Sequence, residues 1–107
     1  MELIKEVSSI CNELLALFDI EKMIVFGIKR KENDLSVTDV DIAVISNVLS
    51  CKNDWLKKAY LEIDSDIPFD LFLYTPEEWD ISVRDSASFA SRILRKGCVV
   101  YEKKKDA

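Results

Sequence analysis

Apolar residues recur along the first part of the chain at the spacing of an amphipathic helix. Between residues 2 and 18 they fall at positions i, i+3, i+4 and i+7, which places them on one helix face. The pattern predicts a helix over residues 2–18 that packs on a sheet. The same spacing over residues 52–64 predicts a second helix. Its Trp55 and Tyr60 follow the helical period, so we expect them in the core or an interface rather than stacked on bases.

Shorter apolar runs predict β-strands. The first covers residues 23–26 and stops at Gly27, where a glycine lets the backbone turn sharply. We therefore expect a basic and polar loop over residues 27–38. A second strand is predicted over residues 39–45 and a third over residues 66–74, with Pro68 near its start. Residues 98–101 predict a last, short strand.

Two helices are predicted between the third strand and the last one. Thr75 can cap a helix, Pro76 suits the first helical position, and acidic residues follow in the first turn. Residues 86–96 predict the final helix, with Gly97 as its C-cap. The element order predicts an α+β fold, with a small mixed β-sheet backed by helices in an α/β sandwich-like arrangement. We expect a single domain over residues 1–107.

Three aspartates stand out on the predicted strands. Asp39 and Asp41 are separated by one residue, so both carboxylates leave the same face of a strand, about 7 Å apart. Like charges placed so closely destabilise a sheet, and a divalent cation such as Mg²⁺ or Mn²⁺ would remove that cost. Asp70 lies inside an otherwise apolar strand, where a carboxylate is costly unless it is paired or metal-bound. A lone aspartate in a strand is usually an edge or bend residue, but three converging carboxylates explain this set better.

Composition narrows the possible chemistry. The chain is 49% hydrophobic and 33% charged, which is typical of a globular protein, and its net charge of −5 argues against bulk binding to nucleic acid. No apolar run approaches the roughly 20 residues of a membrane helix, and no signal-peptide pattern is present. Three widely spaced cysteines indicate free thiols in a reducing cytoplasm. The absence of histidine excludes Ser-His-Asp and Cys-His catalysis.

The spacing of these residues resembles a known family. Gly27 and Ile28, then ten residues, then Asp39-Val40-Asp41 resemble the glycine-serine, ten-residue, Asp-x-Asp signature of the DNA polymerase beta nucleotidyltransferase superfamily. The similarity is greatest to the minimal nucleotidyltransferases, a single-domain group that includes antitoxins. Asp70 corresponds to the family's third acid. Ile28 departs from the pattern, because it stands where the family has serine.

The resemblance implies a nucleotidyltransferase fold and a metal-dependent site. Asp39, Asp41 and Asp70 would be both catalytic residues and ligands of Mg²⁺ or Mn²⁺. Nucleotide-binding residues would be Gly27, Ile28, Lys29 and Lys31. The reaction implied is transfer of a nucleoside monophosphate from an NTP, with ATP as the expected donor, to a hydroxyl group. The implied partner is a small helical protein of the HEPN class, whose tyrosine could be the acceptor in a toxin–antitoxin pair. A homo-oligomer is compatible with this hypothesis.

Alternatives remain open. Lys29, Arg30 and Lys31 are equally compatible with an ordinary solvated loop. A rival function is that of a binding module that keeps the fold, has little or no catalysis and acts by protein association. Its partner would then lie on an open sheet face near Phe72 and Tyr74. If the missing hydroxyl is the main defect of an enzyme, Ile28→Ser should raise transfer roughly tenfold. An antibiotic-modifying nucleotidyltransferase is a weaker third hypothesis.

Overall fold

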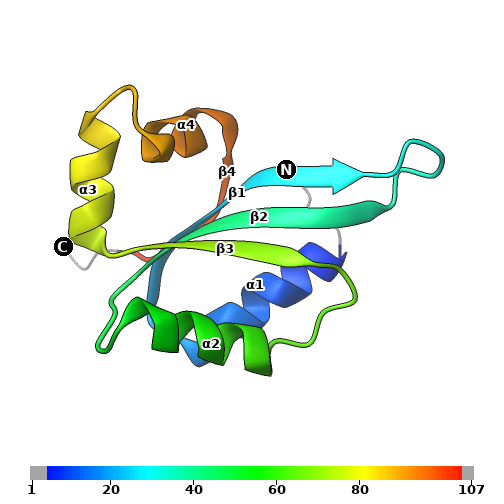
Figure 1. Ribbon diagram of the computed structural model, residues 1–107, viewed down its shortest axis with the longest axis horizontal. Helices are drawn as coiled ribbons and strands as arrows, with labels where there is room; N and C mark the ends of the chain where they lie inside the picture. Colours follow the sequence, from blue (N-terminus) through cyan, green and yellow to red (C-terminus); the bar gives the residue numbers. More distant parts are fainter. Residues whose placement is uncertain (1–4, 105–107) are drawn as a thin grey trace.

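The computed structural model describes residues 5–104 of the chain. Helices lie at the start and in the second half of this region, and a long hairpin lies between them (Figure 1). In chain order the elements of these residues are α1 (Lys5–Leu17), β1 (Ile20–Arg30), β2 (Val37–Ser46), α2 (Lys52–Glu62), β3 (Phe69–Tyr74), α3 (Pro76–Arg84), α4 (Phe89–Lys96) and β4 (Cys98–Glu102).

The four strands form one mixed sheet in the order β3-β2-β1-β4. β1 pairs antiparallel with both β2 and β4, whereas β2 pairs parallel with β3. The parallel pairing is possible because α2 provides the crossover between β2 and β3. A small mixed sheet backed by helices was predicted, and this α+β class is confirmed.

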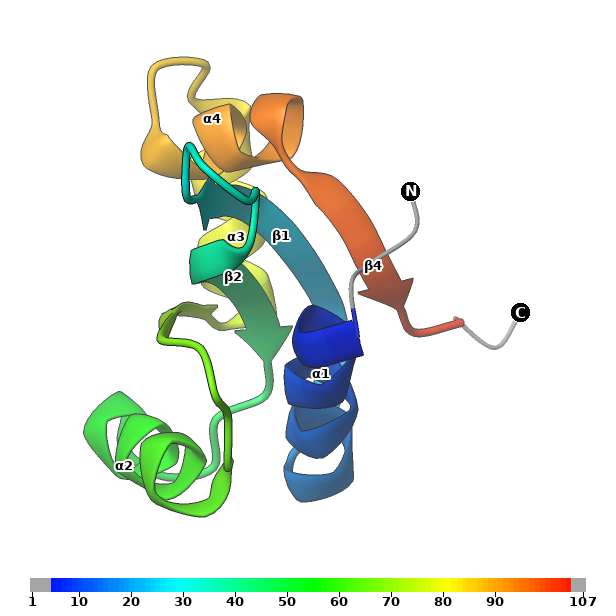
Figure 2. The ribbon, with the colours of Figure 1, turned by 90° about the vertical axis from the view of Figure 1, so that its right-hand side faces the viewer.

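Each face of the sheet has its own apolar core. α1 and α2 cover one face (Figure 1). There Leu14 and Trp55 are buried in one core with residues of the strands. α3 and α4 cover part of the opposite face, where Trp79 and Ile93 are buried. Figure 2 shows the two helix pairs on opposite sides of the strands. Alternate residues of β2 enter the two cores, as strand geometry requires: Val40, Ile42 and Val44 the first, and Ala43 and Ile45 the second.

The prediction that the chain turns at Gly27 is wrong. β1 continues through Gly27 to Arg30, and the loop is confined to residues 31–36. The extension is possible because Ile28 and Lys29 find partners in β2, namely Val40 and Asp39. The turn occurs instead at the hairpin tip, where Leu35 has a left-handed backbone with φ of 60°. Polar residues at the solvated end of a long hairpin were thus mistaken for a loop.

The helices predicted over residues 52–64 and 86–96 and the strand predicted over residues 66–74 are shorter than predicted. α1 is described from Lys5, so the first residues of the predicted helix lie outside the described part of the chain. β3 begins at Phe69, because the Ser65 hydroxyl and the backbone of Ile67 exchange hydrogen bonds of 2.8 and 3.2 Å in a turn before the strand. The predicted start of α3 is confirmed by a capping box, in which Thr75 and Glu78 each bond the other's backbone N–H.

The prediction of an open sheet face near Phe72 and Tyr74 is also wrong. The Tyr74 ring packs edge-on against Trp79 of α3, with centroids 5.2 Å apart. The Phe72 ring lies 5.6 Å from that of Phe89 of α4. Both residues are only partly exposed. The helix pair that follows β3 therefore covers the surface that the sequence analysis left open.

Candidate metal and nucleotide site

Three carboxylates lie on the sheet face that α3 and α4 cover only in part. Asp41 of β2 pairs in register with Asp70 of β3, and paired strands lie about 4.8 Å apart. Asp39 precedes Asp41 by two residues, so its side chain leaves the same face about 7 Å away. Asp70 is exposed, whereas Asp39 and Asp41 are half-buried. The backbone therefore brings the three predicted catalytic residues to one face.

The surroundings of the Asp41 carboxyl disfavour its ionised form. Burial raises the pKa of this carboxyl above its usual value, and the negative charge of Asp70 is the next cause. Lys29 lowers the pKa, while Asp39 and a side-chain hydrogen bond with Asp70 raise it further. A bound cation would compensate the negative charge of the Asp41–Asp70 pair.

Gly27 gives the Asp41 side chain the room that it occupies. The two residues are partners across the β1–β2 ladder, next to an irregularity that accommodates Phe26. A Cβ atom on Gly27 would lie 2.5 Å from Oδ2 of Asp41, far inside van der Waals contact. No glycine among residues 5–104 has a positive φ, so this one is required for space rather than for a turn.

The predicted phosphate contacts occupy different places on the hairpin. Lys29 is exposed and pairs with Asp39, so it belongs to the carboxylate face. Lys31 is exposed in the loop, where its backbone N–H donates a 2.9 Å hydrogen bond to the carbonyl of Ser36. Ile28 pairs with Val40 and packs against the core beneath α1 and α2, on the opposite face from the carboxylates. An apolar residue at position 28 is thus explained by core packing.

The donor atoms suit a hard divalent cation, although the side chains do not enclose one in their present rotamers. Carboxylate oxygens are the ligands that Mg²⁺ and Mn²⁺ prefer. Among residues 5–104, no three His, Cys, Asp or Glu side chains are grouped so as to hold a metal ion. Asp41 and Asp70 therefore fit as two neighbouring ligands. Asp39 is the further carboxylate on this face, about 7 Å along β2 from Asp41.

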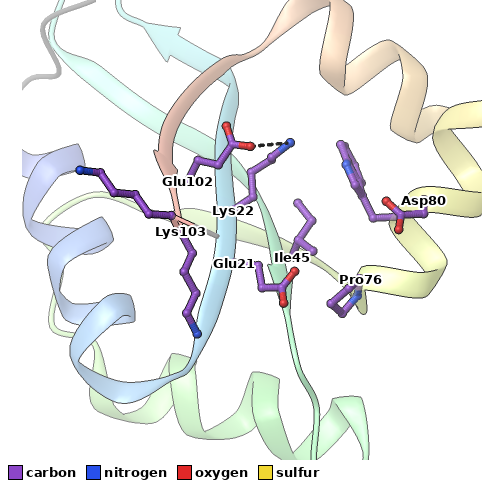
Figure 3. A pocket seen from close by; sticks show the side chains of 9 residues that line it. Glu21, Lys22, Ile45, Pro76, Asp80, Glu102 and Lys103 are labelled. Carbon is purple, nitrogen blue, oxygen red and sulfur yellow. Dashed lines mark ion pairs between the residues drawn. The ribbon is translucent and has the colours of Figure 1, made fainter. Parts of the chain in front are cut away.

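A cavity of about 520 Å³ lies toward the other end of the hairpin (Figure 3). Its walls include buried Trp79 and Ile45, together with charged residues of both signs. Two of these, Lys22 and Glu102, form an ion pair of 3.6 Å. Ile45 follows Asp41 by four residues, or roughly 13 Å of strand. Because its charges are mixed, this cavity indicates no ligand class, and the carboxylate face remains the candidate site.

Two aromatic residues beside the carboxylates were not predicted from the sequence as part of the site. Phe26 immediately precedes Gly27, and Phe89 begins α4. Both rings contact Phe72, which follows Asp70 by two residues on β3. Strand alternation in the sequence predicted that Asp70 and Phe72 share a face. The contact with Phe89 was not, because it depends on how α4 packs on the sheet.

Comparison of the chain with models of protein families, with curated proteins and with solved structures gives no match. None of the helices between residues 5 and 104 combines the length and the apolar character needed to cross a membrane. The functional assignment therefore depends on the carboxylate face itself and on the motif that led to it.

Proposed function

We propose that the chain is a nucleotidyltransferase with the nucleotidyltransferase fold, dependent on Mg²⁺ or Mn²⁺, with ATP as the expected donor. The observation that carries the proposal is the in-register pair of Asp41 and Asp70, with Asp39 on the same face. Two like charges at paired positions lower the stability of a sheet. A function that requires a cation at this position accounts for their presence. Gly27 supports the proposal, because a residue without a side chain at this position leaves space for the Asp41 carboxylate.

The predicted residues on the carboxylate face and in the hairpin loop have distinct roles in the proposed site. Asp41 and Asp70 would hold the cation, with Asp39 as the further ligand. A bound divalent ion neutralises polyphosphate charge and favours the ionised form of an acceptor hydroxyl. Lys29 lies on the same face and adds positive charge for phosphate oxygens. Lys31 is the more distant cation, in the hairpin loop.

The transfer step requires little covalent chemistry from the protein. The acceptor oxygen forms a bond to the α-phosphorus of the NTP, while the bond from that phosphorus to the bridging oxygen breaks. Pyrophosphate leaves with the electron pair of the broken bond. The hydroxyl proton passes to a carboxylate and then to water. Asp70 is the exposed member of the set and is therefore the carboxylate most open to an acceptor. Positioning and charge stabilisation supply the rest.

The proposed acceptor is a hydroxyl on another protein. By the motif resemblance, the partner would be a small helical protein of the HEPN class, its tyrosine would receive the nucleotide, and the chain would act in the cytoplasm as the antitoxin.

A binding module of the same fold, with little or no catalysis, is the second candidate. It is favoured by the absence of an assembled three-ligand group among residues 5–104. It is also favoured by the packing of Ile28, which directs the side chain at the motif's serine position into the core. Such a protein would act by association alone.

Transfer of label from ATP distinguishes the two candidates. The chain would be incubated with ATP labelled at the α-phosphate, Mg²⁺ or Mn²⁺, and the product of a neighbouring reading frame that encodes a small helical protein. We expect label on that protein, lost with EDTA and with Asp41→Asn, but retained in Asp54→Asn, which removes an exposed acid of α2. A tight complex without label would support the binding module. Label that survives EDTA or Asp41→Asn would contradict the proposed metal site.

A further inference from the structure

Three phenylalanine rings from three elements meet beside the carboxylates. Phe26 of β1 lies edge-on to Phe72 of β3 and to Phe89 of α4, with centroid distances of 5.2 and 5.7 Å. Phe72 and Phe89 are 5.6 Å apart and tilted by 53°. We call these residues the phenylalanine cluster. Edge-on and tilted contacts at these distances are the favourable arrangements for aromatic pairs, so the cluster is a defined packing unit.

The phenylalanine cluster marks the boundary between the covered and uncovered parts of this sheet face. Along β3, Asp70, Phe72 and Tyr74 share the face at steps of about 7 Å. Tyr74 lies under Trp79 of α3, Phe72 contacts Phe89 of α4, and Asp70 is exposed. Phe89, at the first residue of α4, is therefore the part of the helical cover that is nearest to Asp70 along this strand.

Phe89 keeps exposed apolar surface although it belongs to the phenylalanine cluster. Its side chain is 44% exposed, although two rings already pack against it. The polyphosphate of a nucleotide held at Asp41 and Asp70 would place its nucleoside within reach of a neighbouring aromatic surface. Planar bases stack on aromatic side chains, and every base has a face that can do so.

We propose that the exposed surface of Phe89 is the nucleobase platform of this site. The inference rests on the proposed function, since it requires a nucleotide whose phosphates lie at the carboxylates. Phe26 and Phe72 act as positioning residues that hold the Phe89 ring in place. Stacking does not read the hydrogen-bonding edge of a base, so the platform accepts nucleoside triphosphates of different bases.

The test compares ligands with and without a base. Binding of Mg²⁺·ATP and of Mg²⁺·tripolyphosphate is measured by calorimetry for the wild type, Phe89→Leu, Phe89→Tyr and Leu94→Ala. Phe89→Leu removes the ring but keeps apolar packing, while Phe89→Tyr keeps the ring. Leu94→Ala is a matched control, because Leu94 is also on α4 and is 45% exposed. Melting curves confirm that each variant is folded.

We expect Phe89→Leu to weaken ATP binding about tenfold and to leave tripolyphosphate binding unchanged, since only ATP has a base to stack. Phe89→Tyr and Leu94→Ala should bind both ligands as the wild type does. Unchanged ATP binding in Phe89→Leu would overturn the platform while leaving the proposed function in place. An equal loss for both ligands would overturn it as well, because the ring would then support the carboxylates. If the wild type binds neither ligand, the proposed function fails and the platform fails with it.

Discussion

The space around the Asp41 carboxylate depends on the absence of a side chain at Gly27. Gly27→Ala would place a Cβ atom 2.5 Å from Oδ2 and 3.2 Å from Cβ of Asp41, so the carboxylate would have to move. We expect the variant to fold, because the obstructing atoms belong to a partly exposed side chain. Its affinity for Mg²⁺·ATP should fall at least about tenfold, a loss of roughly 1.4 kcal/mol, measured by calorimetry.

Gly97→Ala is the matched control for this prediction. A Cβ atom there would meet Ile24 and the carbonyl of Ile93, so that variant should be destabilised by core strain. Its nucleotide affinity, measured below its melting temperature, should be retained. Wild-type affinity in Gly27→Ala would show that Asp41 does not need its present position.

The expected effect of Ile28→Ser differs from the one that the motif suggested. Its side chain packs in the core on the face opposite the carboxylates, so a serine hydroxyl at this position would not meet a phosphate in the present backbone. We expect Ile28→Ser to lose about 1–3 kcal/mol of unfolding free energy in urea, because apolar contacts are removed from a partly buried site. Nucleotide transfer should not increase. Ile28→Val, which keeps most of the contacts, should lose less than Ile28→Ser.

A tenfold gain in transfer by Ile28→Ser would contradict this account. It would mean that the backbone between Gly27 and Lys29 turns toward the carboxylates when nucleotide binds. The measurement therefore also tests whether β1 stays regular past Gly27 in the working protein.

At the scale of elements, one ion pair joins three parts of the fold. The Lys52 ammonium at the start of α2 lies 2.7 Å from Glu78 of α3 and donates a 3.2 Å hydrogen bond to the carbonyl of Leu73 in β3. The hydrogen bond from Lys52 is the first cause that lowers the pKa of the Glu78 carboxyl, and the backbone N–H of Thr75 is the second. Glu78 thereby links α2 to the capping box of α3.

This link predicts a pH-dependent contribution to stability. Because the folded-state pKa of Glu78 is lowered, its contribution is present above the ordinary value of 4.5 and is lost as pH falls through the folded-state pKa. Glu78→Gln should cost about 1 kcal/mol or less at pH 7, since the pair is solvated. The difference from the wild type, measured by urea unfolding, should shrink below about pH 4. A difference that is constant with pH would show that the carboxylate charge contributes nothing.

The sequence predicted some elements well because their signals are local. Thr75, Pro76 and Glu78 mark the start of α3 by chemistry within four residues, and the structure places it there. The end of β1 was predicted wrongly, because Lys29 and Arg30 have the composition of a loop although they continue a hairpin. Whether a polar segment stays in a ladder depends on its partner strand, and local composition does not contain that information.

At the scale of the whole molecule, the carboxylate face illustrates the same limit. Strand alternation predicted that Asp39 and Asp41 share a face, and a mixed sheet backed by helices was expected from the element order. The pairing of Asp41 with Asp70 depends on the parallel register of β2 and β3, which is a tertiary property. The contacts of Phe72 and Tyr74 with α4 and α3 likewise depend on the face of the sheet on which these two helices pack.

The central claim is that the fold tolerates a like-charge pair because a cation and a nucleotide use it. The claim predicts opposite effects of Asp41→Asn on the free and the liganded protein. Without ligand, the variant should melt roughly 2–6 °C higher than the wild type, because a repulsion worth up to about 1 kcal/mol is removed. With Mg²⁺·ATP in large excess, the wild type should gain about 2–3 kcal/mol of stability, whereas the variant should gain none.

Thermal unfolding of wild type and Asp41→Asn, with and without saturating Mg²⁺·ATP, therefore tests the account most directly. We predict that the order of stability reverses: the variant is the more stable protein alone, and the wild type is the more stable one with ligand. Asp54→Asn should behave as the wild type in both conditions. A wild-type melting temperature that Mg²⁺·ATP leaves unmoved, or an equal rise in both proteins, would contradict the proposed site.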